Sequence, residues 1–425
     1  MNIAVIGLGY IGLPTAALFT RSGHRVYGYD VDAKLRRNLQ RGEVTTAEGP
    51  VREAALEALA SGRLTIVDDV PSAQAYILCL PTPTHDGKPD LRYVETAAAA
   101  VAAVAEPASI LVLESTVPPG ATERIFERAL NAAGKSIDDF HVAHCPERVI
   151  PGAIVHELRT NGRVVGGRTP ADAEIVRDLY ASFCESAIAA TSTRTAEFVK
   201  IVENTFRDVN IAFANELAIV AEELGIDVWE TIDLANRHPR VNILQPGPGV
   251  GGHCIPVDPH FLSDASPFAT ELIQAGRRVN DRMPHRIVRR ITELVEPVPG
   301  QKIALLGAAY KADIDDARES PTSRIDALLR ERGYATAIYD PHVKQFHRPL
   351  CDSLEEAVTG ADAIVLVTPH AIFRTIRPAM IASMMRTRQL VDTRRFFDEQ
   401  EWQRVGFACY LLGRPIKRLA EGALA

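Results

Sequence analysis

The feature that most constrains the fold is a glycine pattern directly after the first apolar run of the chain. Residues 3–7, IAVIG, have the composition of a buried strand, and three glycines follow in the spacing G-x-G-x-x-G, at Gly7, Gly9 and Gly12. A helical pattern continues to residue 22, and a second apolar run ends at Asp30. A strand, a glycine turn, a helix and a strand ending in an acidic residue are typical of a dinucleotide-binding βαβ unit.

Each part of this pattern has a physical role in binding NAD. Gly7 permits the tight turn, Gly9 lets the backbone approach a pyrophosphate, and Gly12 allows the helix to pack closely on the strand. The N-terminus of the helix offers unpaired N–H groups to the phosphates. Asp30 suits a hydrogen bond to a ribose 2′-hydroxyl and would repel a 2′-phosphate, which favours NAD over NADP. The alternative is a turn with a purely structural role.

Further apolar runs alternate with helical segments along the N-terminal part of the chain. They are AYILCLP, SILVLEST, FHVAHCPE and AIAATS, and their alternation with helices predicts a parallel, doubly wound α/β sheet. From about Thr195 the pattern changes, because apolar residues recur at helical spacing with no proline or glycine before Gly225. This segment predicts one long helix that links two domains and supplies an oligomer interface, with a simple connector as the alternative.

The C-terminal part repeats the strand rhythm of the N-terminal part. After a hinge at VEPVPG (295–300) come the runs KIALLGAAY, TAIYDP, AIVLVT and QLVDTR, which predict a second Rossmann-like fold. Its first turn lacks a complete G-x-G-x-x-G, so a ligand other than a dinucleotide is expected there. The predicted domains are an NAD-binding domain (1–193), a central helical and dimerisation domain that carries a cysteine loop (194–296), and a C-terminal ligand-binding domain (297–425).

Bulk properties narrow the class of protein. A chain of 425 residues is too long for one hydrophobic core, and a net charge of -7 argues against nucleic acid as a partner. No stretch reaches the ~18 apolar residues that span a membrane, and the N-terminus enters a strand directly, so a cytoplasmic location is expected. The six cysteines have no C-x-x-C spacing, which indicates neither a disulfide framework nor a zinc ribbon.

Polar residues on the predicted long helix are candidates for an active site. Lys200 and Asn204 are four residues apart and share one face, with Arg207 three residues further on. A lysine beside an amide can hold a developing oxyanion or a water molecule. A solvated helix face is the alternative, although the apolar neighbours favour partial burial.

One cysteine directly follows a glycine-rich segment. PGPGVGGHC, residues 246–254, places Cys254 after four glycines, and a thiolate is the side-chain nucleophile most readily available near neutral pH. His253 invites a Cys–His dyad, but adjacent side chains generally point apart. A metal site built from His253, Cys254, Asp258 and His260 is disfavoured by the two prolines and the ligand spacing, so no metal is expected. Asp258 could instead orient a water or a base near the thiol.

A dinucleotide site combined with a nucleophilic cysteine predicts a specific chemistry. Hydride transfer from an alcohol gives an aldehyde, which a thiolate captures as a thiohemiacetal. A second hydride transfer gives a thioester that water hydrolyses. The net result converts CH2OH into a carboxylate with two NAD.

The long segments HCPERVIPG, TAEFVKIVENTFRDVNIAFANEL, LANRHPRVNILQPGPGVGGHC and DDARESP resemble the UDP-glucose/GDP-mannose dehydrogenase family, and the resemblance covers essentially the whole chain. It is strongest to the branch that acts on UDP-N-acetyl-D-mannosamine. The resemblance implies four-electron oxidation of C6 of that UDP-sugar to the uronate, with two NAD+ consumed. It also implies a homodimer with shared active sites, in which Arg240 reaches the partner subunit.

The resemblance assigns roles to individual residues. It implies Cys254 as the nucleophile, Lys200 with Asn204 and a water for oxyanion stabilisation and acid–base work, and Asp258 as an assisting group. Besides the glycines and Asp30, it implies that the NAD site is lined by Tyr10, Ile11, Thr82 and Thr116. Contacts to the UDP-sugar are implied for Arg148, Val149, Lys200, Asn204, Arg207, His238, Arg240, Gly251, Tyr310, Lys311, Arg318 and Arg394.

One departure from the UDP-glucose branch limits this transfer. That branch has a second glutamate four residues after the first, whereas here Glu147 is followed by Pro151. Glu147 alone therefore activates the water or only organises its loop. Rival readings are another UDP-sugar as substrate (UDP-GlcNAc, UDP-GalNAc or UDP-glucose), a two-electron β-hydroxyacid dehydrogenase, which would not need Cys254, and an NAD-binding sensor without turnover.

Overall fold

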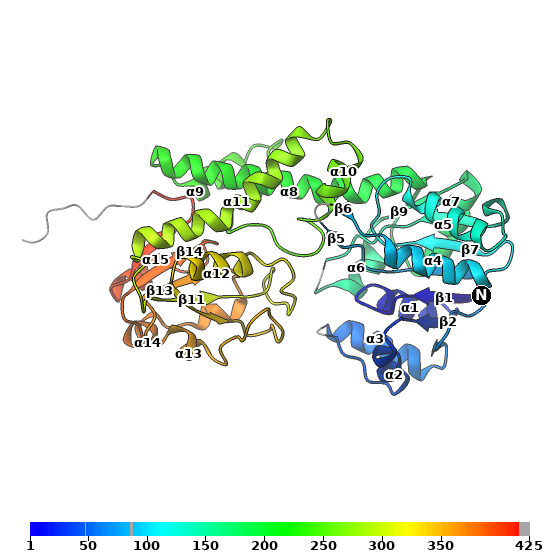
Figure 1. Cartoon of the computed structure of the whole chain (residues 1–425), viewed down its shortest axis with the longest axis horizontal. Coiled ribbons are helices and arrows are strands. Elements are labelled where there is room, and N and C mark those ends of the chain that lie inside the picture. The colour runs from blue at the N-terminus through cyan, green and yellow to red at the C-terminus, as the bar shows by residue number, and fades with distance from the viewer. Residues whose placement is uncertain (47, 86–87, 151, 416–425) are drawn as a thin grey trace, which may run out of the picture. The chain divides into compact units, whose positions relative to one another are not determined.

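The computed structural model describes residues 1–46, 48–85, 88–150 and 152–415 (Figure 1). The chain divides into two compact units. The first comprises Met1–Glu203 with His260–Pro267, and the second comprises Asn204–Pro259 and the chain from Phe268 onward. Each unit contains one large sheet with helices packed against it, so the predicted α/β class with two Rossmann-like folds is confirmed.

The sheet of the first unit has eight strands in the order β10-β9-β8-β7-β4-β1-β2-β3. Ile3 of β1 lies opposite Val26 of β2 on one side and Ala75 of β4 on the other, both in parallel register. The strands are β1 (Asn2–Ile6), β2 (Arg25–Tyr29), β3 (Leu64–Ile66), β4 (Ala75–Leu78), β7 (Ile110–Leu113), β8 (His141–His144), β9 (Arg163–Gly167) and β10 (Ile188–Ser192). A separate two-stranded ribbon pairs β5 (Thr84–His85) with β6 (Lys88–Pro89).

One pair of strands departs from the fully parallel sheet that the sequence pattern predicts. β8 and β9 are antiparallel, with Ala143 opposite Gly167, whereas the other pairs of this sheet are parallel. Alternation of strands and helices predicts the parallel arrangement on average, but no local pattern marks the direction in which a strand enters the sheet. β3 and β9 were also not anticipated, and β3 has only three residues.

Helices cover both faces of this sheet. In β1 the residues alternate between two hydrophobic cores: Ile3 and Val5 pack in one, and Ala4 and Ile6 pack in the other. A strand that is apolar on both faces is what a doubly wound fold requires. The helices are α1 (Gly12–Arg21), α2 (Ala33–Gln40), α3 (Gly49–Ala60), α4 (Arg92–Val104), α5 (Ala121–Ala132), α6 (Ile154–Thr160) and α7 (Pro170–Tyr180), with the 3-10 turn η1 (Ile137–Asp139).

The second unit combines long helices with a five-stranded parallel sheet in the order β12-β11-β13-β14-β15. The predicted long helix is α8 (Thr193–Leu224), which begins in the first unit and ends in the second. α9 (Val228–Ala235), α10 (Asp258–Ala265) and α11 (Glu271–Leu294) follow. The sheet elements are β11 (Lys302–Leu306), α12 (Pro321–Glu331), β12 (Ala335–Tyr339), α13 (Leu354–Val358), β13 (Ala363–Leu366), η2 (Ala371–Thr375), α14 (Pro378–Met384), β14 (Gln389–Asp392), α15 (Glu399–Arg404) and β15 (Ala408–Leu411).

A buried carboxylate joins α8 and α11 to the sheet of the second unit. Glu222 of α8 pairs with Arg286 at 2.6 Å and Arg290 at 2.9 Å, and it accepts hydrogen bonds from the Tyr410 hydroxyl and the Gly413 N–H. Burial alone would raise the pKa of Glu222, but these hydrogen bonds and the charge of Arg286 hold it below its ordinary value. The carboxylate is therefore ionised at neutral pH and satisfied by four partners.

Within the described ranges, none of the helices combines the length and the apolar character needed to cross a bilayer.

Candidate active site

The glycine turn of the first unit has the steric requirements that its spacing predicts. Gly7 has φ +91°, and a Cβ there would lie 2.3 Å from the Cys79 carbonyl oxygen. A Cβ on Gly12 would lie 1.8 Å from the Gly7 carbonyl oxygen, so α1 can start this close to β1 only without a side chain. A Cβ on Gly9 would meet no atom within 4 Å. The turn is tightly packed at its ends and open in its middle, which fits the approach of a pyrophosphate.

Asp30 stands at the end of β2, as the sequence indicates. Its Oδ2 accepts a hydrogen bond from the Leu8 N–H at 2.8 Å, and its Oδ1 accepts one from the Asp32 N–H at 2.9 Å. The carboxylate thus ties the glycine turn to the second strand. Carboxylate oxygens each have more than one lone pair, so Asp30 retains acceptor capacity for a ribose hydroxyl.

The other predicted NAD residues follow strands of the same sheet. Tyr10 and Ile11 lie in the turn after β1, Thr82 lies in the loop after β4, and Thr116 lies in the loop after β7. These strands are mutually parallel, so their carboxyl ends share one edge of the sheet, which is the edge where ligands bind in folds of this kind. The Leu80 N–H donates to Ser115 Oγ at 2.8 Å and joins two of these loops.

Glu147 and Lys200 come together within the first unit. Lys200 Nζ lies 3.5 Å from Glu147 Oε2, and the two side chains are only 7% and 17% exposed. Glu147 also accepts the N–H of Val149, so it organises its own loop. A mostly buried lysine beside a carboxylate is suited to proton transfer and to stabilising negative charge. Pro151, which marks the departure from the UDP-glucose branch, lies outside the described residues.

Sequence reasoning missed a histidine beside this pair. His144 ends β8, is fully buried, and its Nδ1 lies 3.2 Å from Thr122 Oγ1. Burial and then the charge of Lys200 lower the pKa of His144 to about 3, so its ring is neutral at physiological pH. Its Nε2 has no hydrogen-bond partner among the described residues. The only signal in the sequence was its position directly before the Cys-Pro-Glu segment.

Arg148 makes contacts that the sequence did not indicate. Its guanidinium pairs with Glu203 through two nitrogens, and its Nη1 donates to the Gly162 carbonyl at 2.7 Å. Its own carbonyl accepts a hydrogen bond from Asn161. Both predicted sugar contacts of this loop, Arg148 and Val149, are half-buried, and the arginine is held in one orientation by its carboxylate partner.

The cysteine loop of the second unit is tightly packed around its glycines. A Cβ on Gly251 would lie 2.7 Å from the Glu319 carbonyl oxygen and 2.8 Å from Tyr310 Cβ. The Gly252 N–H donates to the Arg318 carbonyl at 3.1 Å. Cys254 itself is half-buried and is in no disulfide. The bare backbone therefore lets this loop lie directly on the loop after β11.

Three predicted catalytic or binding residues meet at the start of α10. Asn204 of α8 donates a hydrogen bond to the Asp258 carboxylate and accepts one from Arg207, and Asn204 and Asp258 are 1% and 3% exposed. The Asp258 N–H donates to the Cys254 carbonyl at 2.8 Å. The buried amide–carboxylate pair thus adjoins the turn that carries the thiol. These residues belong to the second unit, whereas Lys200 and the glycine turn belong to the first.

The loop after β11 presents Tyr310, Lys311 and Arg318. Burial, followed by the negative charge of Asp316, raises the pKa of Tyr310 to about 12, so its hydroxyl stays protonated at neutral pH. Arg318 donates to Asp316 at 2.6 Å, and His253 Nδ1 lies 3.7 Å from the same carboxylate. The His253 ring therefore lies beside the Asp316 carboxylate, at a distance longer than a hydrogen bond.

The remaining predicted sugar contacts lie elsewhere in the second unit. The Arg394 guanidinium lies on Gly247, since a Cβ there would be 2.3 Å from Nη1. Burial lowers the pKa of Arg394 to about 10 although Asp392 opposes it, so the group is still a cation at neutral pH. His238 and Arg240 are exposed residues of the segment after α9, and the Arg240 N–H donates to His238 Nδ1 at 3.3 Å.

The first turn of the second sheet resembles that of the first sheet but lacks two of its three glycines. Gly307 has φ +93° and donates to the Tyr339 carbonyl, just as Gly7 donates to the Tyr29 carbonyl. Ala309 stands where Gly9 stands in the first turn, and α12 begins only at Pro321, after a much longer loop. A methyl group and a long loop replace the open helix start, which disfavours a second dinucleotide.

Comparison with protein families gives three matches along the chain. The descriptions are those of the UDP-glucose/GDP-mannose dehydrogenase family: its NAD binding domain matches residues 1–184, its central domain matches residues 194–282, and its UDP binding domain matches residues 304–399. The boundaries of 193 and 296 that the sequence suggests remain predictions.

Individual relatives match over nearly their whole length. UDP-N-acetyl-D-mannosamine dehydrogenase of Methanocaldococcus jannaschii is 42% identical, with 97% of this chain and 96% of that protein covered. NDP-N-acetyl-D-galactosaminuronic acid dehydrogenase of Ralstonia nicotianae is 41% identical, with 92% and 95% covered. The solved structure of the UDP-D-ManNAc dehydrogenase of Pyrococcus horikoshii superposes with a TM-score of 0.92 at 41% identity, covering 97% of this chain and 99% of that one.

Proposed function

Because the chain belongs to the UDP-glucose/GDP-mannose dehydrogenase family and is an NAD-dependent UDP-sugar dehydrogenase, we propose that it oxidises C6 of UDP-N-acetyl-D-mannosamine to the uronate. The reaction consumes one water and two NAD+ and yields the carboxylate, two NADH and three protons. The two relatives named for this substrate support the choice of sugar. The relative named for a galactosaminuronic acid keeps the other acetamido sugars as rivals.

The observation that carries the four-electron scheme is the placement of Cys254. A half-buried thiol that is in no disulfide follows a loop in which Gly251 lies too close to the Glu319 backbone for a side chain, and the buried Asn204–Asp258 pair adjoins its turn. A two-electron dehydrogenase has no need of a thiol in such a setting, because the ketone or aldehyde it forms is released. A binding sensor needs neither the thiol nor the Lys200–Glu147 pair.

The residues of the chain divide the chemistry between them, and bound NAD would accept a hydride in each oxidation. Lys200, with Asn204 and a water, stabilises the developing oxyanion and carries out the acid–base work on the hydroxyl proton. The Cys254 thiolate adds to the aldehyde carbon, and the resulting thiohemiacetal loses the second hydride to become a thioester. A water, oriented by Asp258 or Glu147, cleaves the thioester and returns the thiol.

The glycine turn fits the cofactor. The middle of the turn is open at Gly9, its ends are closed at Gly7 and Gly12, and the N-terminus of α1 lies directly behind. None of the six cysteines, all of which lie in the described ranges, forms a disulfide, which is typical of a reducing compartment. We therefore also propose that the enzyme works in the cytoplasm.

A panel of UDP-sugars tests the proposed substrate. Purified protein is incubated with NAD+ and, in separate reactions, UDP-N-acetylmannosamine, UDP-N-acetylglucosamine, UDP-N-acetylgalactosamine and UDP-glucose. We expect two NADH per sugar consumed and at least about tenfold higher kcat/KM for the mannosamine derivative, the ratio that about 1.4 kcal/mol of transition-state binding provides. One NADH per sugar would refute the four-electron scheme. Preference for another sugar would refute the substrate but not the chemistry.

We further propose a homodimer formed through α8, with Arg240 contributing to the active site of the partner subunit. Exposed apolar residues recur along one face of α8 in the second unit at spacings that keep them aligned: Phe206, Phe213, Val220 and Leu224, with 61%, 52%, 44% and 67% exposed. Such a stripe is typical of an interface between subunits.

Phe213→Asp tests this interface, because a charge in the middle of a stripe that a partner subunit would bury is strongly unfavourable. We expect wild-type protein to sediment as a dimer at micromolar concentration and Phe213→Asp to sediment as a monomer. Leu56→Asp, at an exposed leucine of α3 outside the stripe, is the matched control and should remain dimeric. Wild-type protein that sediments as a monomer would overturn the proposal.

A further inference from the structure

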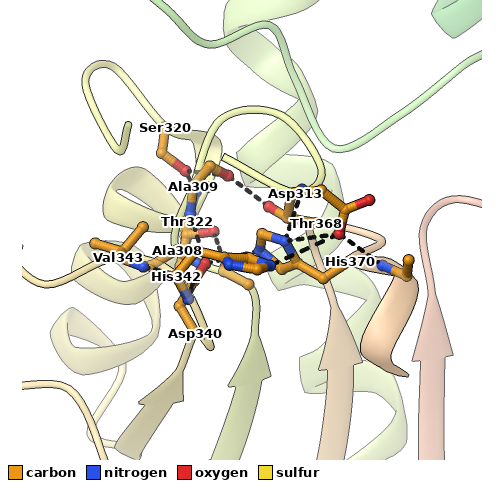
Figure 2. A network of polar contacts seen from close by, with 12 residues as sticks. Ala308, Ala309, Asp313, Ser320, Thr322, Asp340, His342, Val343, Thr368 and His370 are labelled. Carbon is orange, nitrogen blue, oxygen red and sulfur yellow. Dashed lines mark hydrogen bonds and ion pairs between the residues drawn. The ribbon is translucent and has the colours of Figure 1, made fainter. Parts of the chain in front are cut away.

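A buried polar network lies at the carboxyl ends of β11, β12 and β13 (Figure 2). Its centre is Asp340, which directly follows β12 and whose side chain is fully buried. Asp340 Oδ2 accepts the N–H groups of Ala308 and Ala309 at 2.6 and 2.9 Å. Its Oδ1 accepts two further N–H groups from the segment after β12. The first residues of the loop after β11 are thereby fixed to the end of β12.

His370 extends this network to the middle of the loop. Its Nε2 lies 2.9 Å from Asp340 Oδ2, and its Nδ1 accepts the Asp313 N–H at 2.9 Å. Because Nδ1 accepts a backbone hydrogen, the proton of the neutral ring lies on Nε2 and is donated to Asp340. His370 has no exposed surface, whereas Asp313 is exposed. The buried ring therefore connects a fixed carboxylate to a loop that reaches the surface.

Asp313 makes a second contact that strengthens the same connection. Its Oδ1 accepts the Ala371 N–H at 2.9 Å, at the start of η2. Asp313 has φ +61°, a left-handed conformation that is unfavourable for a non-glycine residue. The contacts to His370 and Ala371 compensate for that cost. Ser320, at the far end of the loop, and Thr368, after β13, both donate to the Ala309 carbonyl. These hydrogen bonds hold the two ends of the loop together.

Asp313, His342 and His370 have the composition of a metal site, but a hydrogen bond already occupies one of the ligand atoms. Asp313, His342 and His370 offer three ligand atoms within 4.8 Å of one another. A metal ligand needs a free lone pair, and the Nδ1 lone pair of His370 is occupied by the Asp313 N–H. Asp313 Oδ1 lies 3.7 Å from His342 Nε2, which is farther than a hydrogen bond. The ring of His370 is engaged as a connector on both sides.

We infer that His370 is a positioning residue for the UDP-sugar: it tethers the loop 308–320, which carries Tyr310, Lys311 and Arg318, through the Asp313 N–H. The inference rests on the proposed function, in which this loop contacts the substrate. Tyr310 and Arg318 lie on either side of Asp313, and both contact the residues of the cysteine loop. Release of Asp313 would let these side chains move together and weaken binding of the nucleotide without touching the reacting carbon.

Two substitutions of His370 separate its two hydrogen bonds. In His370→Asn the amide oxygen takes the place of Nδ1 and can still accept the Asp313 N–H. In His370→Gln the amide nitrogen takes the place of Nε2 and can still donate to Asp340, but the acceptor for Asp313 is lost. Both variants remove one buried hydrogen bond, so both should lower the melting temperature by similar amounts. Only His370→Gln should loosen the loop.

The measurements are binding of UDP by calorimetry, steady-state kinetics and hydrogen exchange on the full-length protein. We expect His370→Gln to raise the Kd for UDP and the KM for the UDP-sugar about tenfold, with kcat and the KM for NAD+ within about twofold of wild type. His370→Asn should restore wild-type Kd and KM. His342→Ala, which removes a neighbouring ring outside the tether, should leave all four quantities unchanged.

Hydrogen exchange reports on the tether without any ligand. The Asp313 amide should exchange slowly in wild type although the residue is exposed, and residues 308–320 should exchange faster in His370→Gln than in His370→Asn. Rapid exchange of the wild-type Asp313 amide, or equal Kd in wild type and His370→Gln, would overturn the inference. The inference would also be overturned if the wild-type protein bound zinc in a 1:1 ratio and His342→Ala did not. A protected loop in a protein that binds no UDP would instead refute the proposed function of the loop.

Discussion

Cys254→Ala is expected to abolish uronate formation while leaving the protein folded and able to bind NAD and UDP. In the proposed scheme the thiol holds the aldehyde covalently for the second oxidation, so its loss should lower kcat for uronate by at least about 10³-fold. The first oxidation does not require the thiol. We therefore expect at most one NADH per sugar, formed slowly, with the aldehyde as product.

The experiment combines NADH absorbance with mass spectrometry of the sugar nucleotide. In wild-type reactions quenched with acid, the peptide that contains Cys254 should carry the mass of the sugar nucleotide as an acyl adduct. Cys351→Ala is the matched control, because Cys351 is also a half-buried cysteine of the second unit outside any disulfide and has no role in the scheme. Two NADH per sugar from Cys254→Ala, at the wild-type rate, would eliminate the covalent mechanism.

Gly12→Ala should disable NAD binding, whereas Gly9→Ala should leave the fold intact. Alanine favours a helix over glycine, so at the first position of α1 the substitution would stabilise the protein if there were room. There is none, because the new Cβ would lie 1.8 Å from the Gly7 carbonyl oxygen. The contact is with backbone, which cannot rotate away, so α1 must shift from β1. We expect a melting temperature several degrees lower and a Kd for NAD at least about 100-fold higher.

Gly9→Ala is the matched control, since its Cβ meets no protein atom within 4 Å. Its melting temperature should equal that of the wild type, and its affinity for NAD should fall because the methyl group occupies the approach of the pyrophosphate. The pair therefore separates steric damage to the turn from loss of ligand contact. Calorimetry measures the affinity for NAD, and thermal denaturation measures the melting temperature. Wild-type NAD affinity in Gly12→Ala would contradict the proposed site.

Local patterns anticipated much of the architecture. The glycine spacing after β1 predicted the first turn, the uninterrupted apolar periodicity predicted α8, and the repeated strand runs predicted the second sheet. Each of these signals depends on residues close together in the sequence, where side-chain periodicity and backbone sterics act directly. The antiparallel entry of β9 was missed because strand direction depends on the path of the preceding connection.

The polar contacts of the site could be anticipated only in part. Cys254, Lys200 and Asn204 could be named as candidates because their residue types are chemically unusual in their segments. His144 was missed, because a single histidine at the end of a strand has no periodicity and only the buried lysine beside it gives it significance. His370 was missed for the same reason, since its partner Asp313 is 57 residues away in the sequence.

What the sequence by itself determined is thus the set of elements and the chemistry they carry: a glycine turn that accepts a dinucleotide, a helix with a lysine and an amide one turn apart, and a thiol on a bare loop. Only the tertiary structure decided which buried polar groups satisfy one another, as in the pairs Asn204–Asp258 and His370–Asp313. The reason is physical. A buried donor or acceptor must find a partner, but it selects that partner by distance in space, and distance in space leaves no regular trace along the chain.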